Sequence, residues 1–362
     1  MRKRVALTLA VCFTISLLAG CKDTGSAAEN NNNTTQQPAA DASAPKDQNG
    51  SKIIMKIAHA AKDGSARDLG AETIKEVVEA ESGGAIEVQI YPNSQLGGST
   101  DLIQGMQTDT IEMVILPSSF MGSFQPLTTL MDIPYLFPTE YEKLDKIEHG
   151  EAAAALLATT EEIGVTTLDI WHTGYKAFTA NSKLEMPEDF KSLKFRVMPS
   201  QILFAQYEAL GATAVSMDFS ECYNALQTGA IDGQENPLDT TTDMNFQEVQ
   251  KYCTLSNHGV LDQFIMVSSN WWDGLSEENK AAIMKGIDAG RQVCVDKTHE
   301  SESASRQKIL DAGVEIHELT DEELEAWKEA LAVCKDTYIE NYGEKGEALL
   351  KLFEEELAAL EE

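Results

Sequence analysis

A strand and helix alternation that occurs twice in the chain constrains the fold most strongly. In its first occurrence, Ile86, Val88 and Ile90 alternate with polar residues as in a strand, whereas residues 66–81 repeat apolar side chains at helical spacing. The predicted order is strand 53–58, helix 66–81, strand 85–91, helix 99–108 and strand 111–116. This order predicts an α/β fold in which helices cover a mostly parallel sheet.

The alternation recurs between residues 194 and 234, which predicts a second α/β lobe. Its predicted elements are strand 194–198, helix 200–210, strand 212–216, helix 219–227 and strand 230–234. Roughly 310 residues follow Ser51, a length for which domain-size statistics favour two lobes over one. Strands predicted at 165–170 and 175–179, which follow each other without a full helix, and a strand at 263–268 are the expected crossings between lobes.

One long helical stretch, residues 276–311, changes the pattern. Ser276 is a suitable N-cap, and at about 1.5 Å per residue such a helix spans about 50 Å, which is longer than one small lobe. We therefore expect a two-lobed α/β fold with hinge strands and a long helix that braces both lobes. A capping box of Thr320 with Glu323 predicts a further helix near the C-terminus. The expected lobes are 52–173 with 262–301, and 174–261 with 302–362.

The first 51 residues predict export and anchoring. Residues 2–4 are basic, and the uncharged apolar run 5–19 is too short to span a bilayer as a mature helix, so we expect residues 1–20 to be a signal peptide. The signal ends in Leu-Ala-Gly-Cys, which resembles a bacterial lipobox and predicts a lipoprotein modified at Cys21; the alternative is an ordinary signal with an incidental cysteine. Residues 21–51 are poor in large apolar side chains and predict a disordered tether. The expected location is extracytoplasmic, lipid-anchored to the cell membrane, at the outer face of the cytoplasmic membrane or in the periplasm.

The formal net charge of −31 limits the possible partners. Long-range repulsion opposes approach to nucleic acid and to anionic membrane surfaces. We therefore expect no nucleic-acid partner, and contact with a membrane only through the lipid anchor.

The sequence carries no motif for catalysis or metal binding. It has no nucleophile elbow, HExxH, P-loop or GxGxxG, and none of its six histidines pairs at positions i and i+4. Cys222, Cys253, Cys294 and Cys334 lack CxxC spacing, so they are either small buried residues or disulfide partners rather than zinc ligands. We predict no metal, no cofactor and no enzymatic activity.

Arg196 is a cation inside an apolar strand pattern, between Phe195 and Val197. In open α/β lobes ligands bind beyond the carboxyl ends of the strands, which is where this arginine is expected. Its planar guanidinium suits a carboxylate through two parallel hydrogen bonds. The alternative is an internal salt bridge to one of the many acidic side chains.

The run FSECYNALQTGAIDGQENP, residues 219–237, resembles the substrate-binding subunits of tripartite ATP-independent periplasmic (TRAP) transporters of the dicarboxylate-binding type. The segments IYPNSQLGG, LKFRVMPS and NHGVLDQF add to the likeness, which extends over nearly the whole chain from Ile53. The resemblance implies a transport function. The chain would be a solute-binding protein that binds a small organic acid between its lobes and delivers it to permease subunits driven by an ion gradient.

The resemblance also implies a set of ligand-binding residues. Arg196 matches the arginine that clamps the ligand carboxylate, Asn236 the asparagine that also bonds it, and Phe219 the aromatic residue that packs on the ligand. We expect Gly229 to end the preceding helix and the strand 230–234 to deliver Asn236 to the cleft. Arg196 and Asn236 are thus expected at two strand ends of the second lobe, and Phe219 on the helix predicted between those strands in the sequence.

Four further positions are weaker candidates. Lys176 stands where many members carry a second arginine, and a lysine there provides a point charge in place of a fork. His59, Ser118 and Ser119 match positions that contact ligand in relatives, with solvated loop residues as the alternative for each.

The identity of the acid stays open at this stage. A dicarboxylate, a sugar acid, a sialic acid and a keto acid all present the carboxylate that Arg196 would hold. Two other functions use the same cleft: a receptor that reports its ligand to a sensor kinase, and a secreted enzyme acting on acidic sugars.

Overall fold

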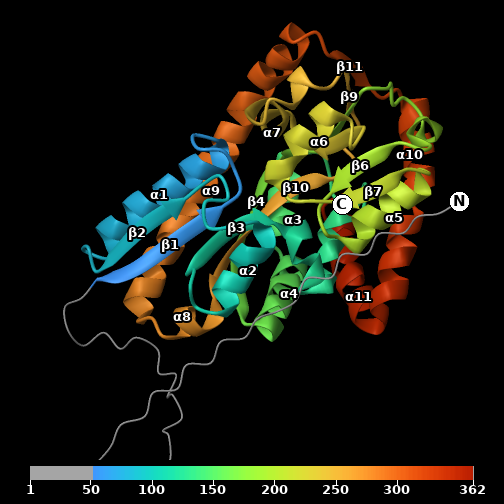
Figure 1. Cartoon of the computed structure of the whole chain (residues 1–362). Helices are drawn as coiled ribbons and strands as arrows, with labels where there is room; N and C mark the ends of the chain where they lie inside the picture. Colours follow the sequence, from blue (N-terminus) through green and yellow to red (C-terminus); the bar gives the residue numbers. More distant parts are fainter. Residues whose placement is uncertain (1–51, 362) are drawn as a thin grey trace, which may run out of the picture. The chain divides into compact units, whose positions relative to one another are not determined.

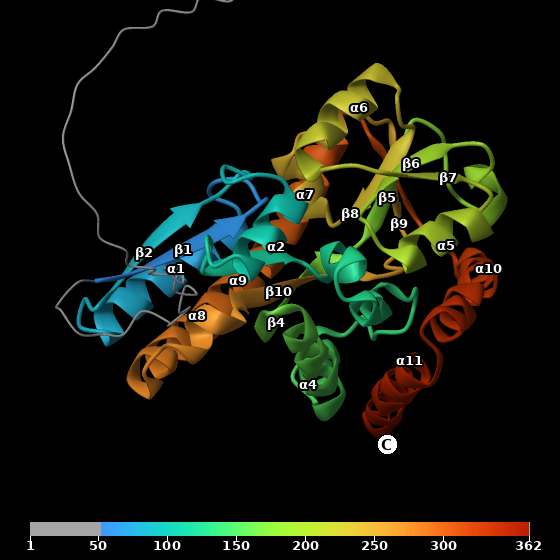
Figure 2. The same cartoon turned by 60° about the horizontal axis from the view of Figure 1, so that its bottom comes forward.

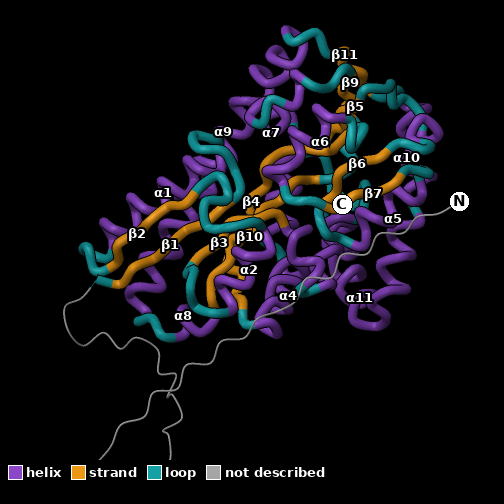
Figure 3. The backbone as a smooth tube through the Cα atoms, in the orientation of Figure 1, coloured by secondary structure: helices purple, strands orange, loops and turns teal. Residues whose placement is uncertain are grey.

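The computed structural model describes residues 52–361, so the predictions for the signal at 1–20, for Cys21 and for the tether at 21–51 lie outside the described residues. All described residues lie in one compact unit of the chain. Two β-sheets, one of five and one of six strands, form the centres of two lobes, and helices surround both sheets (Figures 1 and 3). We call the lobe of the five-stranded sheet the first lobe and that of the six-stranded sheet the second lobe.

The first lobe has a mixed sheet with the order β2-β1-β3-β10-β4. Strand β1 runs parallel to β2 and β3, as the alternation predicted, but β10 runs antiparallel to both β3 and β4. The reason is connectivity: the chain leaves this lobe along β4 and returns along β10, so these two strands must point in opposite directions. The strands are β1 (Ile53–His59), β2 (Ile86–Tyr91), β3 (Met113–Pro117), β4 (Val165–Tyr175) and β10 (Val260–Ser268).

The second lobe has the sheet order β11-β9-β5-β8-β6-β7. Strand β6 is parallel to β7 and β8, as in the second predicted alternation, whereas β5 pairs antiparallel with β8 and β9. Its strands are β5 (Ala177–Ala180), β6 (Lys194–Val197), β7 (Thr213–Ser216), β8 (Gly233–Asn236), β9 (Tyr252–Leu255) and β11 (Glu315–Glu318). The limits of the two lobes in the sequence remain a prediction.

The helices agree with the predicted positions where the sequence was periodic. They are α1 (Ala66–Glu81), α2 (Ser99–Gln107), α3 (Tyr141–Glu148), α4 (Glu151–Ala158), α5 (Gln201–Ala209), α6 (Cys222–Thr228), α7 (Leu238–Asp243), α8 (Ser269–Asp273), α9 (Glu277–Asp311), α10 (Asp321–Leu331) and α11 (Val333–Ala359). Thr320 and Glu323 form the predicted capping box, with a bond from the Thr320 N–H to the Glu323 carboxylate of 2.7 Å. None of the helices in the described part of the chain is both long and apolar enough to cross a membrane.

The segment that delivers Asn236 differs from its prediction in one respect. Gly229 ends α6 in the left-handed conformation with φ 70°, as expected. Strand β8, however, begins at Gly233 and not at residue 230. The N–H groups of Ala230 and Ile231 instead bond the Ala225 carbonyl, at 2.9 and 3.3 Å, and so complete the helix end. Asn236 is then the last residue of its strand.

The long helix α9 contacts both lobes. It packs on α1 and β4 of the first lobe and on α7, which follows β8 of the second, and Figure 2 shows it running from α8 past α1 to α7. Ser276 caps it as predicted, accepting the Asn279 N–H at 3.3 Å. Glycines permit the close approach to α1, because a Cβ atom at Gly290 would lie 2.7 Å from the Gly70 carbonyl oxygen.

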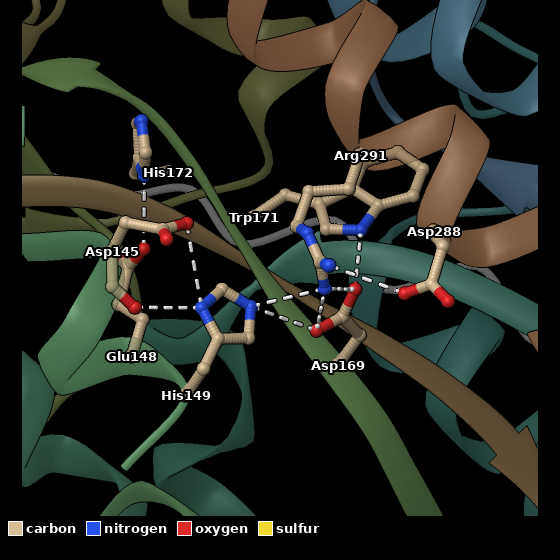
Figure 4. Close-up of polar contacts among 8 residues, drawn as sticks. All are labelled: Asp145, Glu148, His149, Asp169, Trp171, His172, Asp288 and Arg291. Atoms are coloured by element: carbon tan, nitrogen blue, oxygen red, sulfur yellow. Dashed lines mark hydrogen bonds and ion pairs between the residues drawn. The ribbon is translucent and has the colours of Figure 1, made fainter. Parts of the chain in front are cut away.

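A polar network fastens α9 to β4 (Figure 4). Arg291 of α9 donates to both carboxylate oxygens of Asp169, at 2.8 and 2.7 Å, and the indole N–H of Trp171 donates to the same carboxylate at 3.0 Å. The ring of His149 also lies 3.1 Å from Asp169. Asp169 is buried, so this carboxylate depends on the cation of α9, and the pair joins the helix to the strand that leaves the lobe.

The cysteines of the folded part are all free and buried. Cys222, Cys253, Cys294 and Cys334 therefore act as small buried residues, the first of the two interpretations that the sequence allowed. Burial raises the pKa of the Cys253 thiol to about 12, which is the direction expected of an inert core thiol.

Candidate ligand-binding site

A cavity lies between the two lobes and is lined from both. It contains about 370 Å³ free of protein atoms, counting its opening, but only about 20 Å³ can hold the centre of a water molecule. Apolar side chains make up most of the lining, and the polar lining residues are Arg67, Arg196, Asn236 and Gln263. An organic ligand therefore requires the lobes or the lining side chains to move apart before it can enter.

Contacts between loops of the two lobes show that the cleft is closed. A Cβ atom at Gly98, just before α2, would lie 2.7 Å from the Asp218 carboxylate, and one at Gly122 would lie 2.7 Å from the Pro199 carbonyl oxygen. Gly98 and Gly122 belong to the first lobe and their neighbours to the second. Side chains at these glycines would hold the lobes apart.

Arg196 enters the cavity from β6. Its Nε donates to the Met217 carbonyl at 3.2 Å, while its Nη2 is buried without a hydrogen-bond partner. The guanidinium carbon lies 5.8 Å from the ring centre of Phe120 and 5.5 Å from that of Phe219, one ring from each lobe. Desolvation by this burial lowers the pKa of Arg196.

Among residues 52–361, no carboxylate lies within ion-pair distance of Arg196. The alternative of an internal salt bridge is therefore wrong for this residue. A buried cation without an acidic partner is unfavourable by itself, so the geometry leaves a place for an external anion.

Asn236 and Phe219 line the same cavity as Arg196. The Asn236 amide donates one N–H to the side chain of Gln234, and an amide group carries a second N–H. Its position at the carboxyl end of β8 follows from the late start of that strand. The structure thus brings together the three residues that the resemblance implied first, while their contact with a ligand stays a prediction.

Lys176 differs from its expected role. It is the single residue between β4 and β5, is 2 % exposed and is not among the cavity-lining residues. Its ammonium lies 3.2 Å from Glu235 and 3.5 Å from Asp132. Glu235 belongs to the second lobe and Asp132 to the first, so the lysine acts as a counter-ion at the crossing between lobes and not as an open cation for a ligand.

The charge of Glu235 follows from this arrangement. Burial alone would raise the pKa of its carboxyl, but the Lys176 ammonium and hydrogen bonds from His258 and Gln206 hold that pKa well below its usual range. Burial also lowers the pKa of His258, whose ring lies 3.1 Å from the Glu235 carboxylate. The crossing therefore contains an ionised Glu235 held by Lys176.

His59, Ser118 and Ser119 lie behind the cavity wall. All three are buried, so they are not solvated loop residues, and none lines the cavity. Their side chains bond buried carboxylates: His59 lies 3.1 Å from Asp68, Ser118 donates to Asp262 at 3.0 Å, and Ser119 donates to Asp132 at 2.6 Å. Their neighbours Ala60, Pro117 and Phe120 form the wall itself. These polar residues hold the wall in position, and their contact with a ligand stays a prediction.

The lining residues that the sequence did not predict include Arg67, Phe120 and Gln263. Phe120 lies in a 3₁₀ turn that apolar periodicity does not reveal. Arg67 did leave a signal, because a cation in the first turn of a helix opposes the helix dipole. A cation in such an unfavourable position, close to where a strand ends, indicates a residue of the site.

A cleft between two α/β lobes with a buried, unpaired cation in its lining is the arrangement expected of a solute-binding protein. The model of the family "bacterial extracellular solute-binding protein, family 7" matches residues 57–341. The chain belongs to this family, to which the solute-binding proteins of TRAP transporters belong, as the resemblance predicted.

Relatives and solved structures agree with the assignment. The chain is 37 % identical over 304 residues to the C4-dicarboxylate-binding periplasmic protein DctP of Rhodobacter capsulatus, covering 83 % of this chain and 90 % of the relative. A TRAP periplasmic solute-binding protein of Desulfovibrio salexigens with bound orotic acid superposes with a TM-score of 0.83 at 33 % identity, covering 85 % and 99 % of the two chains. A TRAP periplasmic solute-binding protein of Shewanella oneidensis with bound succinate superposes with a TM-score of 0.79 at 31 % identity, covering 84 % of this chain and 99 % of the other.

We predict that Lys176→Met destabilises the protein. It leaves Glu235 buried without its cation, which costs about 3–5 kcal/mol of the free energy of unfolding. Equilibrium urea denaturation measures the loss. Lys183→Met is the matched control, since Lys183 is half exposed where it pairs with Glu315, and it should change stability little. A Lys176 variant as stable as the wild type would contradict the counter-ion role.

We also predict a pH-dependent effect of Asp262→Asn. Burial, with the nearby Asp132 charge, raises the pKa of Asp262 from its ordinary value of 3.8 to about 8. Between these values the folded protein holds one more proton than the unfolded chain, so this carboxyl lowers the free energy of unfolding as the pH rises. Relative to wild type, the free energy of unfolding of Asp262→Asn should rise by about 1.4 kcal/mol per pH unit between about pH 5 and pH 7. Urea denaturation at several pH values tests this, and parallel stability curves would contradict it.

Proposed function

We propose that this chain is an extracytoplasmic receptor that binds a small organic acid between its lobes and delivers it to the permease of a TRAP transporter. The observation that carries the proposal is the buried Nη2 of Arg196, a cavity-lining residue, which has no hydrogen-bond partner among residues 52–361. A ligand carboxylate there accepts the hydrogen bonds that the protein leaves unmade. The ligand thereby cancels the desolvation cost of the guanidinium.

The surroundings of Arg196 favour an anion over water. The rings of Phe120 and Phe219 flank the guanidinium and keep the local dielectric low, which strengthens an ion pair. Asn236 offers an amide donor on the same cavity. An arginine fork with an adjacent amide is the kind of donor set that holds a planar carboxylate.

The relatives support an acidic ligand. Of the three proteins compared above, one is a C4-dicarboxylate-binding protein, and the other two have orotic acid and succinate bound. Each of these ligands carries a carboxylate. Delivery to permease subunits follows from membership of the family, whose TRAP members serve such transporters. Neither a sensor kinase nor an enzymatic reaction on acidic sugars is favoured by any contact described above.

The site is tested by Arg196→Gln and isothermal titration calorimetry with succinate. Losing a charged hydrogen-bonding partner from a buried ion pair should weaken binding at least about tenfold. The same variant should not lower the stability of the ligand-free protein, because the removed charge has no partner in it. Unchanged affinity for succinate would refute the clamp.

Arg291→Gln provides the matched control. Arg291 pairs with Asp169 away from the cavity, so its loss should lower stability and leave succinate affinity unchanged. The two variants thus separate an arginine that holds the ligand from one that holds the fold.

We further propose that Cys21 carries the lipid anchor. The support is the Leu-Ala-Gly-Cys sequence that ends the apolar run. In the native host, Cys21→Ser should move the protein from the membrane fraction to the soluble fraction, while Cys12→Ser, inside the apolar run, should not. Unchanged fractionation of the Cys21 variant would contradict the anchor.

A further inference from the structure

We propose that a second hollow, beside the crossing between the lobes, binds a small organic cation and thereby favours the arrangement of the lobes seen in this structure. The hollow contains about 580 Å³ free of protein atoms, counting its opening, which is a size typical of small-molecule sites. Its described lining residues all differ from those of the Arg196 cavity. Asn236 lines that cavity, whereas the next three residues, 237–239, line the hollow.

The buried carboxylate of Asp239 is the first reason to expect a cation in this hollow. Asp239 is 8 % exposed and lines the hollow from α7. Its Oδ1 atom accepts from the N–H and the hydroxyl of Thr240, but its Oδ2 atom has no hydrogen bond or ion pair within residues 52–361. Burial raises the pKa of this carboxyl, although the charge of Arg67 opposes the rise. The hollow therefore offers a carboxylate whose charge the protein compensates incompletely.

Two tyrosine rings and a second acid extend the same chemistry. Tyr141 and Tyr175 both line the hollow, with 5.1 Å between their ring centres, and the face of an aromatic ring attracts organic cations. Glu302 of α9 also lines it, and this exposed acid has no ion pair within the described residues 52–361. Burial, and then the charges of Glu302 and Asp239, raise the pKa of the Tyr141 phenol. Both acids therefore lie near this ring.

The lining favours an organic cation over a metal ion. No group of three or more His, Cys, Asp or Glu side chains within residues 52–361 is placed to hold a metal. Pro237, Leu238 and Leu255 add apolar surface to the hollow, against which the alkyl groups of an ammonium ion can pack. The lining cation Arg306 pairs with Glu318, so its charge is already balanced.

The walls of the hollow come from both lobes. Tyr141 belongs to α3, which packs on β4 of the first lobe, Asp239 belongs to α7 of the second lobe, and Glu302 lies on α9. A Cβ atom at Gly174 would lie 3.0 Å from the Cβ atom of Pro237, so the walls meet closely at the crossing. A cation between these walls depends on how the lobes are placed, and it stabilises the arrangement that binds it.

Calorimetry with choline and 3,3-dimethylbutan-1-ol tests the site, because the alcohol has the shape of choline with a carbon atom in place of the charged nitrogen. We expect wild type to bind choline at least about tenfold more tightly than the alcohol. Asp239→Asn should weaken choline binding at least about tenfold, and its amide oxygen can still accept from Thr240. Tyr141→Leu should weaken it at least about threefold, because the ring face is lost.

Two variants of exposed acids on α9 keep the test independent of folding. Glu302→Gln should weaken choline binding about threefold, whereas Glu300→Gln should leave it unchanged, because Glu300 pairs with Lys297 and lies outside the hollow. Urea denaturation verifies the fold of each variant. Absence of choline binding by wild type, binding of the alcohol as tightly as choline, or equal effects of the Glu302 and Glu300 variants overturns the site.

Small-angle X-ray scattering tests the effect on the lobes. Saturating choline should lower the radius of gyration of wild type, and the same choline concentration should leave that of Asp239→Asn unchanged. A radius of gyration that choline does not alter in wild type overturns this effect. Neither probe is an acid and Arg196 takes no part in either readout, so these results stand or fall separately from the proposed function.

Discussion

A guanidinium buried without a counter-ion is the feature on which the site depends. The chain has 59 acidic and 28 basic residues, and yet no carboxylate among residues 52–361 lies within ion-pair distance of Arg196. Lys176 shows the usual outcome in the same region: it is equally buried and lies against both Glu235 and Asp132. Two buried cations therefore have opposite roles. The paired lysine stabilises the crossing between lobes, and the unpaired arginine leaves an uncompensated positive charge in the cleft.

The fold places that cation where an external anion can reach it. The chain crosses between sheets along β4 and returns along β10, which makes the crossing a pair of antiparallel strands and leaves the parallel strand ends free to face the cleft. Behind the wall, Ser118 and Ser119 bond buried carboxylates and hold the loop that carries Phe120. Helix α9 contacts elements of both lobes. The rigid parts thus surround the site, and the contacts at Gly98 and Gly122 are among those between the two lobes.

Much of the fold could be predicted because periodicity and caps are local properties. The helix from Ser276, the stop at Gly229 and the strand that carries Arg196 are written in neighbouring residues. Strand direction is not local, so the antiparallel crossing was missed. The start of β8 was also missed, because Ala230 and Ile231 complete a helix end through a bond to a carbonyl five or six residues earlier.

The residues of the site were harder to predict the more their roles depend on tertiary contacts. Arg196, Asn236 and Phe219 lie on the recognisable run and its strand, and they do share one cavity. The ion pairs of Lys176 were not predicted, because its partners are 44 and 59 residues away in the sequence and no local pattern reports such a pairing. Arg67 was overlooked although its first-turn position is electrostatically unfavourable. A charged residue in an energetically unfavourable position is therefore a better indicator of this cleft than the number of charged residues in the sequence.

The most direct test of the account is a crystal structure of the protein with succinate bound. The account predicts a carboxylate within hydrogen-bond distance of the Arg196 guanidinium and the Asn236 amide, with Lys176 still paired to Glu235. A bound acid held elsewhere, or an Arg196 side chain turned toward an acidic residue of the protein, would contradict it.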